Sequence, residues 1–118
     1  MVRRLARMTP EARAWYLAEI AYIAERNPAA AEKIAARMRT ARQTLAEYPK
    51  SGPAGLIPDT RRFVVKPYIM TVRHRSGVLE IAAIRHARQS DAYAPTDILE
   101  DEEGDDLVTD PQIDDPLG

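Results

Sequence analysis

The chain has 118 residues, the size of one globular domain. It has no cysteine and only two histidines, which excludes disulfides, thiolate nucleophiles and cysteine-rich or histidine-rich metal sites. No apolar run approaches the roughly 20 residues that cross a bilayer, and the basic start lacks the apolar segment of a secretory signal. We therefore expect a cytoplasmic protein with no membrane partner, metal or other cofactor.

The net charge of −1 hides a division along the chain. Before position 97 there are 17 basic and eight acidic residues, a net charge of +9, and from position 97 onward there are ten acidic and no basic residues, a net charge of −10. The acidic stretch has too few apolar residues to bury a core. We expect a domain at residues 1–96 and a disordered acidic tail at residues 97–118, which either stays in solvent or docks on the basic domain.

Two helices are predicted after a short first strand at residues 2–7. Thr9 can cap the free N–H groups of a helix, and Pro10 loses no hydrogen bond at the first helical position. Asn27 and Pro28 interrupt this helix and begin another, since the residue before a proline avoids the α conformation. The predicted helices are residues 10–26 and 28–47.

The apolar residues of both predicted helices lie in stripes. In the second helix they recur at spacings of 3, 4, 3 and 4: Ala31, Ile34, Met38, Ala41 and Leu45. In the first helix the stripe is wider and consists of Tyr16, Leu17, Ile20, Ala21, Ile23 and Ala24, with Trp15 near one edge. Such stripes pack against other elements, so we expect an antiparallel helical hairpin.

The pattern changes to strands after a loop at residues 48–55, whose two prolines and two glycines suit neither regular structure. Pro58-Asp59 adds a turn. The predicted strands are residues 60–66, 68–75 and 78–86, with Ser76-Gly77 as a hairpin turn. The predicted fold class is α+β, in the order β-α-α-β-β-β, with the helical hairpin packed on a small, largely antiparallel sheet.

The last predicted strand ends in a group of cations: Arg85, His86 and Arg88. Strict alternation would place Glu80 and His86 on one face of this strand, about 20 Å apart at about 3.3 Å per residue. That separation is too large for concerted proton transfer. The group therefore suits binding of a negatively charged partner better than acid–base chemistry.

Several segments resemble the ParE-type toxins of the ParE/RelE superfamily, in family order and spacing: residues 11–12, 20–31, 45–52, 60–65, 68–70, 78–84 and 86–88. The similarity covers about residues 2–95. It implies a helical hairpin on a small sheet and the toxin of a type II toxin–antitoxin system, of the kind also described as plasmid stabilisation proteins. Asp59 stands where the family often has glycine, and Thr71 where it often has tyrosine.

The resemblance implies a toxin that poisons DNA gyrase, without being an enzyme itself, and that forms a hetero-oligomer with its cognate antitoxin. The residues expected to bind the target are Arg61, Arg62, Arg85, His86 and Arg88. The residues expected to bind the antitoxin are Tyr16, Ile20, Ile23, Ile34, Met38, Arg37 and Arg42. These expectations leave two alternatives open.

The first alternative is a ribosome-dependent mRNA endonuclease like RelE. Its candidate catalytic residues are Arg61, Arg73, Arg85, His86 and Tyr93. Arginine binds phosphate well but abstracts protons poorly, which weakens this alternative. The second alternative is a non-toxic protein-binding module with the same fold.

Overall fold

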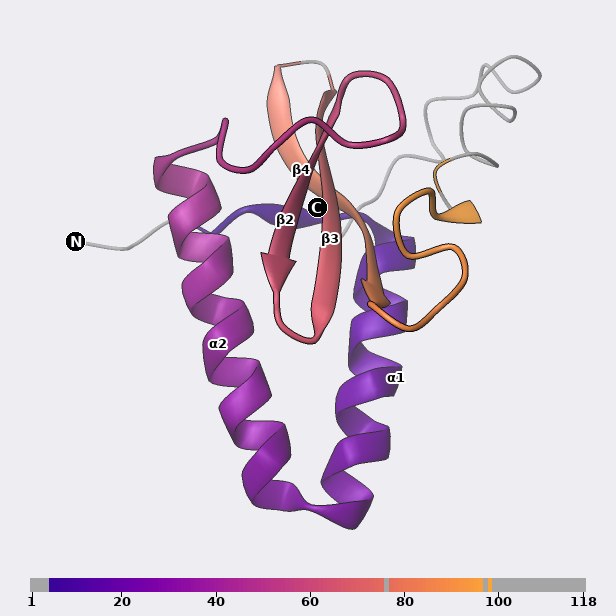
Figure 1. Ribbon diagram of the computed structural model, residues 1–118. Helices are drawn as coiled ribbons and strands as arrows, with labels where there is room; N and C mark the ends of the chain where they lie inside the picture. Colours follow the sequence, from indigo (N-terminus) through magenta and orange to yellow (C-terminus); the bar gives the residue numbers. More distant parts are fainter. Residues whose placement is uncertain (1–4, 76, 97, 99–118) are drawn as a thin grey trace.

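The computed structural model describes residues 5–75, 77–96 and 98 (Figure 1). Two helices pack with a four-stranded sheet of order β1-β4-β3-β2. The elements are β1 (Arg7–Met8), α1 (Pro10–Arg26), α2 (Pro28–Glu47), β2 (Thr60–Val65), β3 (Tyr68–Arg75) and β4 (Val78–His86). This order confirms the predicted α+β fold class. Apart from Ile98, the predicted acidic tail lies outside the described residues.

The two helices begin at the predicted caps. Thr9 Oγ1 accepts a hydrogen bond from the Ala12 N–H at 3.1 Å, and Asn27 Oδ1 accepts one from the Ala30 N–H at 3.0 Å. Each cap satisfies an N–H group that would otherwise lack a helical partner, and such caps contribute about 1 kcal/mol. Figure 1 shows the helices joined at an end that projects past the sheet. No helix of the described residues is both long and apolar enough to cross a membrane.

The sheet contains the predicted meander. β2 pairs antiparallel with β3, which pairs antiparallel with β4, while β1 lies parallel to β4. Of the first strand predicted at residues 2–7, residues 2–4 lie outside the described residues, and residues 5 and 6 are not in a strand, because β1 is Arg7–Met8. Ala6 instead bonds to helix α2: its N–H donates to the Arg42 carbonyl at 3.1 Å, and its carbonyl accepts from Arg42 Nε at 2.9 Å.

A β-bulge interrupts the pairing of β3 with β4. Thr71 pairs with Ala83, but the next residue, Val72, pairs with Ile81, so Ala82 is an extra residue in β4. A bulge shifts the alternation of side chains by one residue. Before Ala82 the odd-numbered residues of β4, such as Ile81, therefore face the helices, and after it the even-numbered residues, such as Ile84, do so.

The main core lies between the helical hairpin and the sheet. Its buried members include Met38 and Leu45 from α2, Met70 from β3, and Ile81 and Ile84 from β4. Four residues of the predicted α2 stripe are buried, and the fifth, Ile34, is half-buried. A second, smaller cluster on the other face of the sheet consists of Ile57, Ala82, Ala83 and Ile98.

The loop before β2 runs beside that strand. The Arg62 N–H donates to the Pro53 carbonyl at 2.9 Å, and the Gly55 N–H donates to the Thr60 carbonyl at 2.8 Å. The loop ends at Asp59, whose φ of 65° lies in the left-handed region. Glycine adopts this conformation without strain and aspartate tolerates it, which is consistent with the expectation, from the resemblance, that glycine often stands at this place.

Candidate functional site

Arg85 is buried, contrary to the expectation of an exposed cationic group at the end of β4. It is 6% exposed, and its Nε donates to Asp91 Oδ2 at 3.2 Å. Its Nη1 donates to the Ile84 carbonyl at 2.9 Å. Because this guanidinium neutralises a carboxylate of the same chain, only His86 and Arg88 of the predicted cluster reach the surface.

Asp91 holds the segment after β4 in place. Its Oδ2 also accepts hydrogen bonds from the Thr96 N–H and Oγ1, both at 3.3 Å. Partial burial acts to raise the pKa of the Asp91 carboxyl, but the bond from the Thr96 N–H and the charge of Arg85 together bring it below its ordinary value. The ionised carboxylate is therefore the form that the fold stabilises.

His86 is held by its neighbours in the turn after β4. Its Nδ1 accepts the Arg88 N–H at 3.2 Å, and its own N–H donates to Gln89 Oε1 at 2.8 Å. Its ring meets the ring of Tyr68 edge-on, with centroids 5.7 Å apart. Since Nδ1 accepts a hydrogen bond, Nε2 is the nitrogen that carries the proton in the neutral ring.

Tyr68 joins this end of the sheet to helix α1. Its hydroxyl donates to Glu19 Oε2 at 2.8 Å, and its ring meets Trp15 edge-on with centroids 6.0 Å apart. Trp15, at the edge of the stripe predicted for α1, thus packs against β3. Burial raises the pKa of the Tyr68 hydroxyl well above its ordinary value, and the hydrogen bond to Glu19 adds to the effect. Tyr68 therefore keeps its proton at physiological pH.

Glu80 lies on the opposite face of the sheet from His86, so the prediction that they share a face was wrong. The bulge at Ala82 is the cause, because it reverses the alternation between the two residues. Glu80 Oε1 accepts from Arg73 Nε at 2.9 Å, and both side chains are largely buried. The carboxylate is thus occupied by an ion pair.

The residues proposed for RNA cleavage do not converge on one site. Arg61 of β2 and Arg73 of β3 lie at the end of the sheet where β2 begins. Arg85 and His86 lie at the far end of β4 and point to opposite faces of the sheet from each other. Tyr93 is exposed, and its ring faces Arg62, whose Cζ lies 5.4 Å from the ring centroid. Arg62 and Tyr93 thus form a cation–π pair on the second face of the sheet, which is the face that the helices do not cover.

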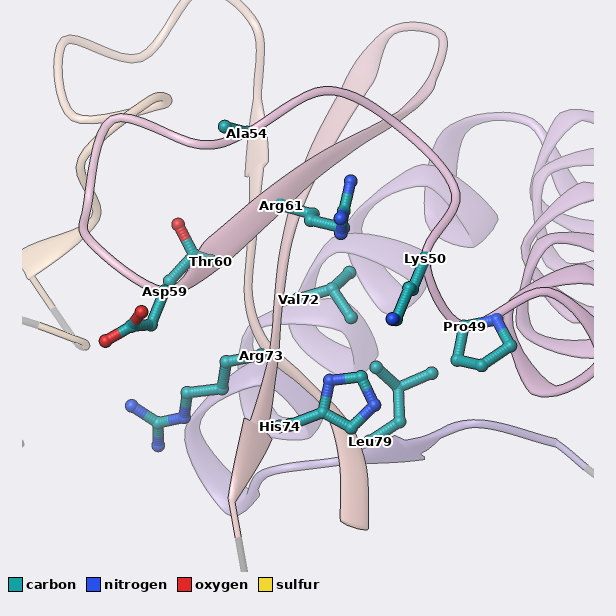
Figure 2. A pocket seen from close by; sticks show the side chains of 10 residues that line it. All are labelled: Pro49, Lys50, Ala54, Asp59, Thr60, Arg61, Val72, Arg73, His74 and Leu79. Carbon is teal, nitrogen blue, oxygen red and sulfur yellow. The ribbon is translucent and has the colours of Figure 1, made fainter. Parts of the chain in front are cut away.

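An open hollow of about 580 Å³ lies at the end of the sheet where β2 begins (Figure 2). Figure 2 shows Lys50, Arg61 and His74 around one side of it, while Asp59 and Arg73 point to the other side. We call this the basic hollow, after Lys50, Arg61 and His74. Sequence reasoning singled out only Arg61 among these three, because nothing local relates a loop lysine to two residues of different strands.

The helical hairpin leaves apolar surface uncovered. Ala12 is the only residue of α1 that is fully buried, whereas Leu17 is 50% exposed. Three of the predicted antitoxin-binding residues are half-buried on α1: Tyr16, Ile20 and Ile23. The stripe predicted for α1 was therefore too wide, because Leu17 and Ala21 both face solvent.

The predicted antitoxin-binding residues of α2 divide into three kinds. Ile34 is half-buried and accessible, but Met38 is 1% exposed and belongs to the core. Arg37 donates to the Lys66 carbonyl, and Arg42 donates to the Ala6 carbonyl. Arg37 therefore bonds α2 to the turn between β2 and β3, and Arg42 bonds α2 to the segment before β1. In the described part of the chain, no three His, Asp or Glu side chains come together as a metal site.

Comparison with known proteins gives consistent matches. Residues 6–91 match the family model described as ParE toxin of type II toxin–antitoxin system, parDE. A candidate toxin of Sinorhizobium fredii, Y4kP, is 45% identical over 71 residues, which are 58% of this chain and 73% of that protein. The toxin RelE2 of Caulobacter vibrioides is 38% identical over 66 residues, 56% of this chain and 75% of that one.

Proposed function

The chain belongs to the ParE toxin family of type II toxin–antitoxin systems, and we propose that it arrests growth by poisoning DNA gyrase in the cytoplasm. Membership of this family implies an antitoxin partner. In this proposal the toxin acts by binding the gyrase–DNA complex, and the cognate antitoxin neutralises it by forming a hetero-oligomer.

The candidate catalytic groups already pair with other side chains of the protein or lie on different faces of the sheet, which supports a binding role rather than a catalytic one. RNA cleavage needs a base for the 2′-hydroxyl, stabilisation of the phosphorane and an acid for the leaving oxygen. Glu80 is paired with Arg73, and Arg85 is buried against Asp91. His86 lies on the other face from Glu80, so these groups cannot act on one phosphate.

Exposed cations at the end of β4 and on the second face of the sheet supply the proposed contact with the target. Arg88 is exposed, and the half-buried Arg62 places its Cζ 5.4 Å from the centroid of the exposed Tyr93 ring. A guanidinium on an aromatic ring can bind phosphate or carboxylate while its hydrocarbon stem stays packed. Arg62 and Arg88 are therefore the residues whose replacement should reduce toxicity most.

RNA cleavage remains the second candidate because one relative, at 38% identity, bears the name RelE2. The two candidates differ in what they damage inside the cell. Expression without antitoxin should induce the DNA-damage response if gyrase is the target. Cleavage of messenger RNA within ribosomes, with no DNA-damage response, would support the second candidate. Absence of growth arrest would instead support the non-toxic binding module.

The uncovered hairpin surface is the proposed antitoxin site. Half-buried Tyr16, Ile20 and Ile23, with exposed Leu17 beside them, form an apolar surface on α1. Ile34 adds to it from α2. An amphipathic partner helix can bury such a surface with residues at helical spacing.

Paired variants test the target surface in cells. The double substitution Arg62→Ala and Arg88→Ala should restore growth when the toxin is expressed alone. The matched control, Arg39→Ala, removes an exposed arginine of α2 and should leave growth arrest intact. Equal toxicity of the double variant and the control, at equal protein levels, would reject this surface.

A further inference from the structure

We propose that the basic hollow binds the acidic segment at residues 100–106 of the same chain. Six of those seven residues are aspartate or glutamate. The proposal concerns a contact within the chain and does not depend on which target the toxin has. Three observations carry it: the charge of the hollow, the place where the described chain ends, and the distance that the segment can span.

The first observation is an uncompensated positive charge at the hollow. Lys50 and His74 are exposed, and Arg61 is partly exposed, with its Nη1 donating to the Gly52 carbonyl at 2.9 Å. Within the described residues, no ion pair engages Lys50 or Arg61. The acidic residue that lines the hollow, Asp59, points away from Lys50 and Arg61 (Figure 2).

The second observation is that the last described residue packs with the loop that borders the hollow, on the face of the sheet opposite Arg61 and His74. Ile98 is 1% exposed and packs in the small cluster that contains Ile57. The Ile57 carbonyl accepts a hydrogen bond from Thr60 Oγ1, and Thr60 lines the hollow. The ion pair of Arg85 with Asp91 secures the segment that leads to Ile98.

The third observation is reach. Residues 100–106 follow Ile98 by two to eight positions, which an extended chain spans in about 7–29 Å at about 3.3–3.6 Å per residue. The segment is thus presented to the hollow at a high effective concentration, on the order of millimolar for a short flexible connection. Contacts that are individually weak in water are enough to favour docking under these conditions.

The lysines of this chain provide an internal control for the test. There are only three, Lys33, Lys50 and Lys66, all of them exposed, and only Lys50 lines the hollow. A carbodiimide joins a carboxylate to a nearby lysine amine as an amide, with loss of water. Treatment of the full chain, followed by mass spectrometry of peptides, therefore reports which lysine lies beside the acidic segment.

We expect amides from residues 100–106 to form with Lys50 at least about five-fold more often than with Lys33 or Lys66, because the tether concentrates the segment there. At about 0.5 M salt this preference should fall, since exposed charges are screened. A mixture of isotope-labelled and unlabelled chains separates contacts within one chain from contacts between chains. Equal yields at the three lysines, or links only between chains, would overturn the proposal.

Substitution of one hollow arginine completes the test. Arg61→Gln should reduce the Lys50 products about three-fold by removing one of the cations that hold the segment. The matched control Arg88→Gln, at the far end of β4, should not change them. If circular dichroism shows that Arg61→Gln fails to fold, the lysine pattern of the unsubstituted chain still decides. A negative outcome rejects the docking alone and leaves the gyrase proposal to its own assays.

Discussion

Arg85 Nε donates to Asp91 Oδ2 at 3.2 Å, and this pair fastens the segment after β4 to the second face of the sheet. The pair joins a 6% exposed arginine to a carboxylate that also binds Thr96. It explains why an arginine can end a buried strand without facing solvent. Removal of one partner should therefore cost more than the loss of an ordinary surface ion pair.

Asp91→Asn should lower the free energy of unfolding by about 1–2 kcal/mol, because it removes a carboxylate charge that pairs with the buried Arg85 guanidinium. The expected fall in melting temperature is roughly 3–10 °C for a chain of this size. Urea unfolding measures the effect. Glu25→Gln is the matched control, since it breaks the exposed pair with Arg26 and should change stability by less than about 0.5 kcal/mol. Equal effects of both substitutions would contradict this role of Asp91.

The contribution of Asp91 should depend on pH. Its folded pKa lies below the ordinary value of 3.8, so the ionised carboxylate stabilises the fold at every pH above that value. This stability is lost as the pH falls through the lower folded pKa. The difference between the unsubstituted chain and Asp91→Asn should therefore be largest near neutral pH and should shrink below pH 3.8. Urea unfolding at both ends of this range checks the sign, and a difference that grows on acidification would refute it.

The left-handed conformation of Asp59 predicts different outcomes for two small substitutions. Asp59→Ala should destabilise the fold by about 1 kcal/mol, because alanine keeps a Cβ that is strained at positive φ but lacks the short polar side chain that lets aspartate tolerate this conformation. Asp59→Gly should be more stable than Asp59→Ala, since glycine adopts this conformation freely. Thermal melts of the two variants test the order, and the reverse order would show that Asp59 does not need this conformation.

The antitoxin surface predicts a contrast between two positions of α1. Leu17→Lys should weaken binding of the cognate antitoxin at least about ten-fold, because it places a charge in an apolar contact. Ala18→Lys, which is also exposed but lies on the side of α1 away from Tyr16, Ile20 and Ile23, should have little effect. Titration calorimetry with the purified antitoxin measures both. Equal affinities of the two variants would place the antitoxin elsewhere on the toxin.

Local signals explain why the helices were predictable. Thr9 and Asn27 cap the helices that follow them through contacts within three residues, so the sequence alone contains both partners of each bond. The strand meander was predictable for a similar reason, because its turns are short. By contrast, the start of β1 was not predictable. Ala6, just before this two-residue strand, bonds to Arg42 of α2, which is 36 positions away in the sequence.

The candidate sites depended on contacts that no local pattern records. The extra residue Ala82 in β4 leaves alternation looking intact in the sequence, yet it separates Glu80 from His86. Asp91, which pairs with Arg85, lies six residues later in an irregular segment. Neither the helical nor the strand periodicity predicts which side chains meet in such a segment. The basic hollow likewise combines a loop residue, Lys50, with strand residues that only the folded sheet brings near it.

A cleavage assay with purified DNA gyrase tests the central claim most directly. Gyrase is incubated with supercoiled plasmid, ATP and increasing amounts of the toxin, and protein–DNA complexes are denatured before electrophoresis. We predict linear DNA that increases with toxin, is suppressed by the cognate antitoxin, and is absent with the Arg62→Ala and Arg88→Ala double variant. Unchanged gyrase activity at toxin concentrations that produce messenger RNA cleavage in a translating extract would contradict the claim.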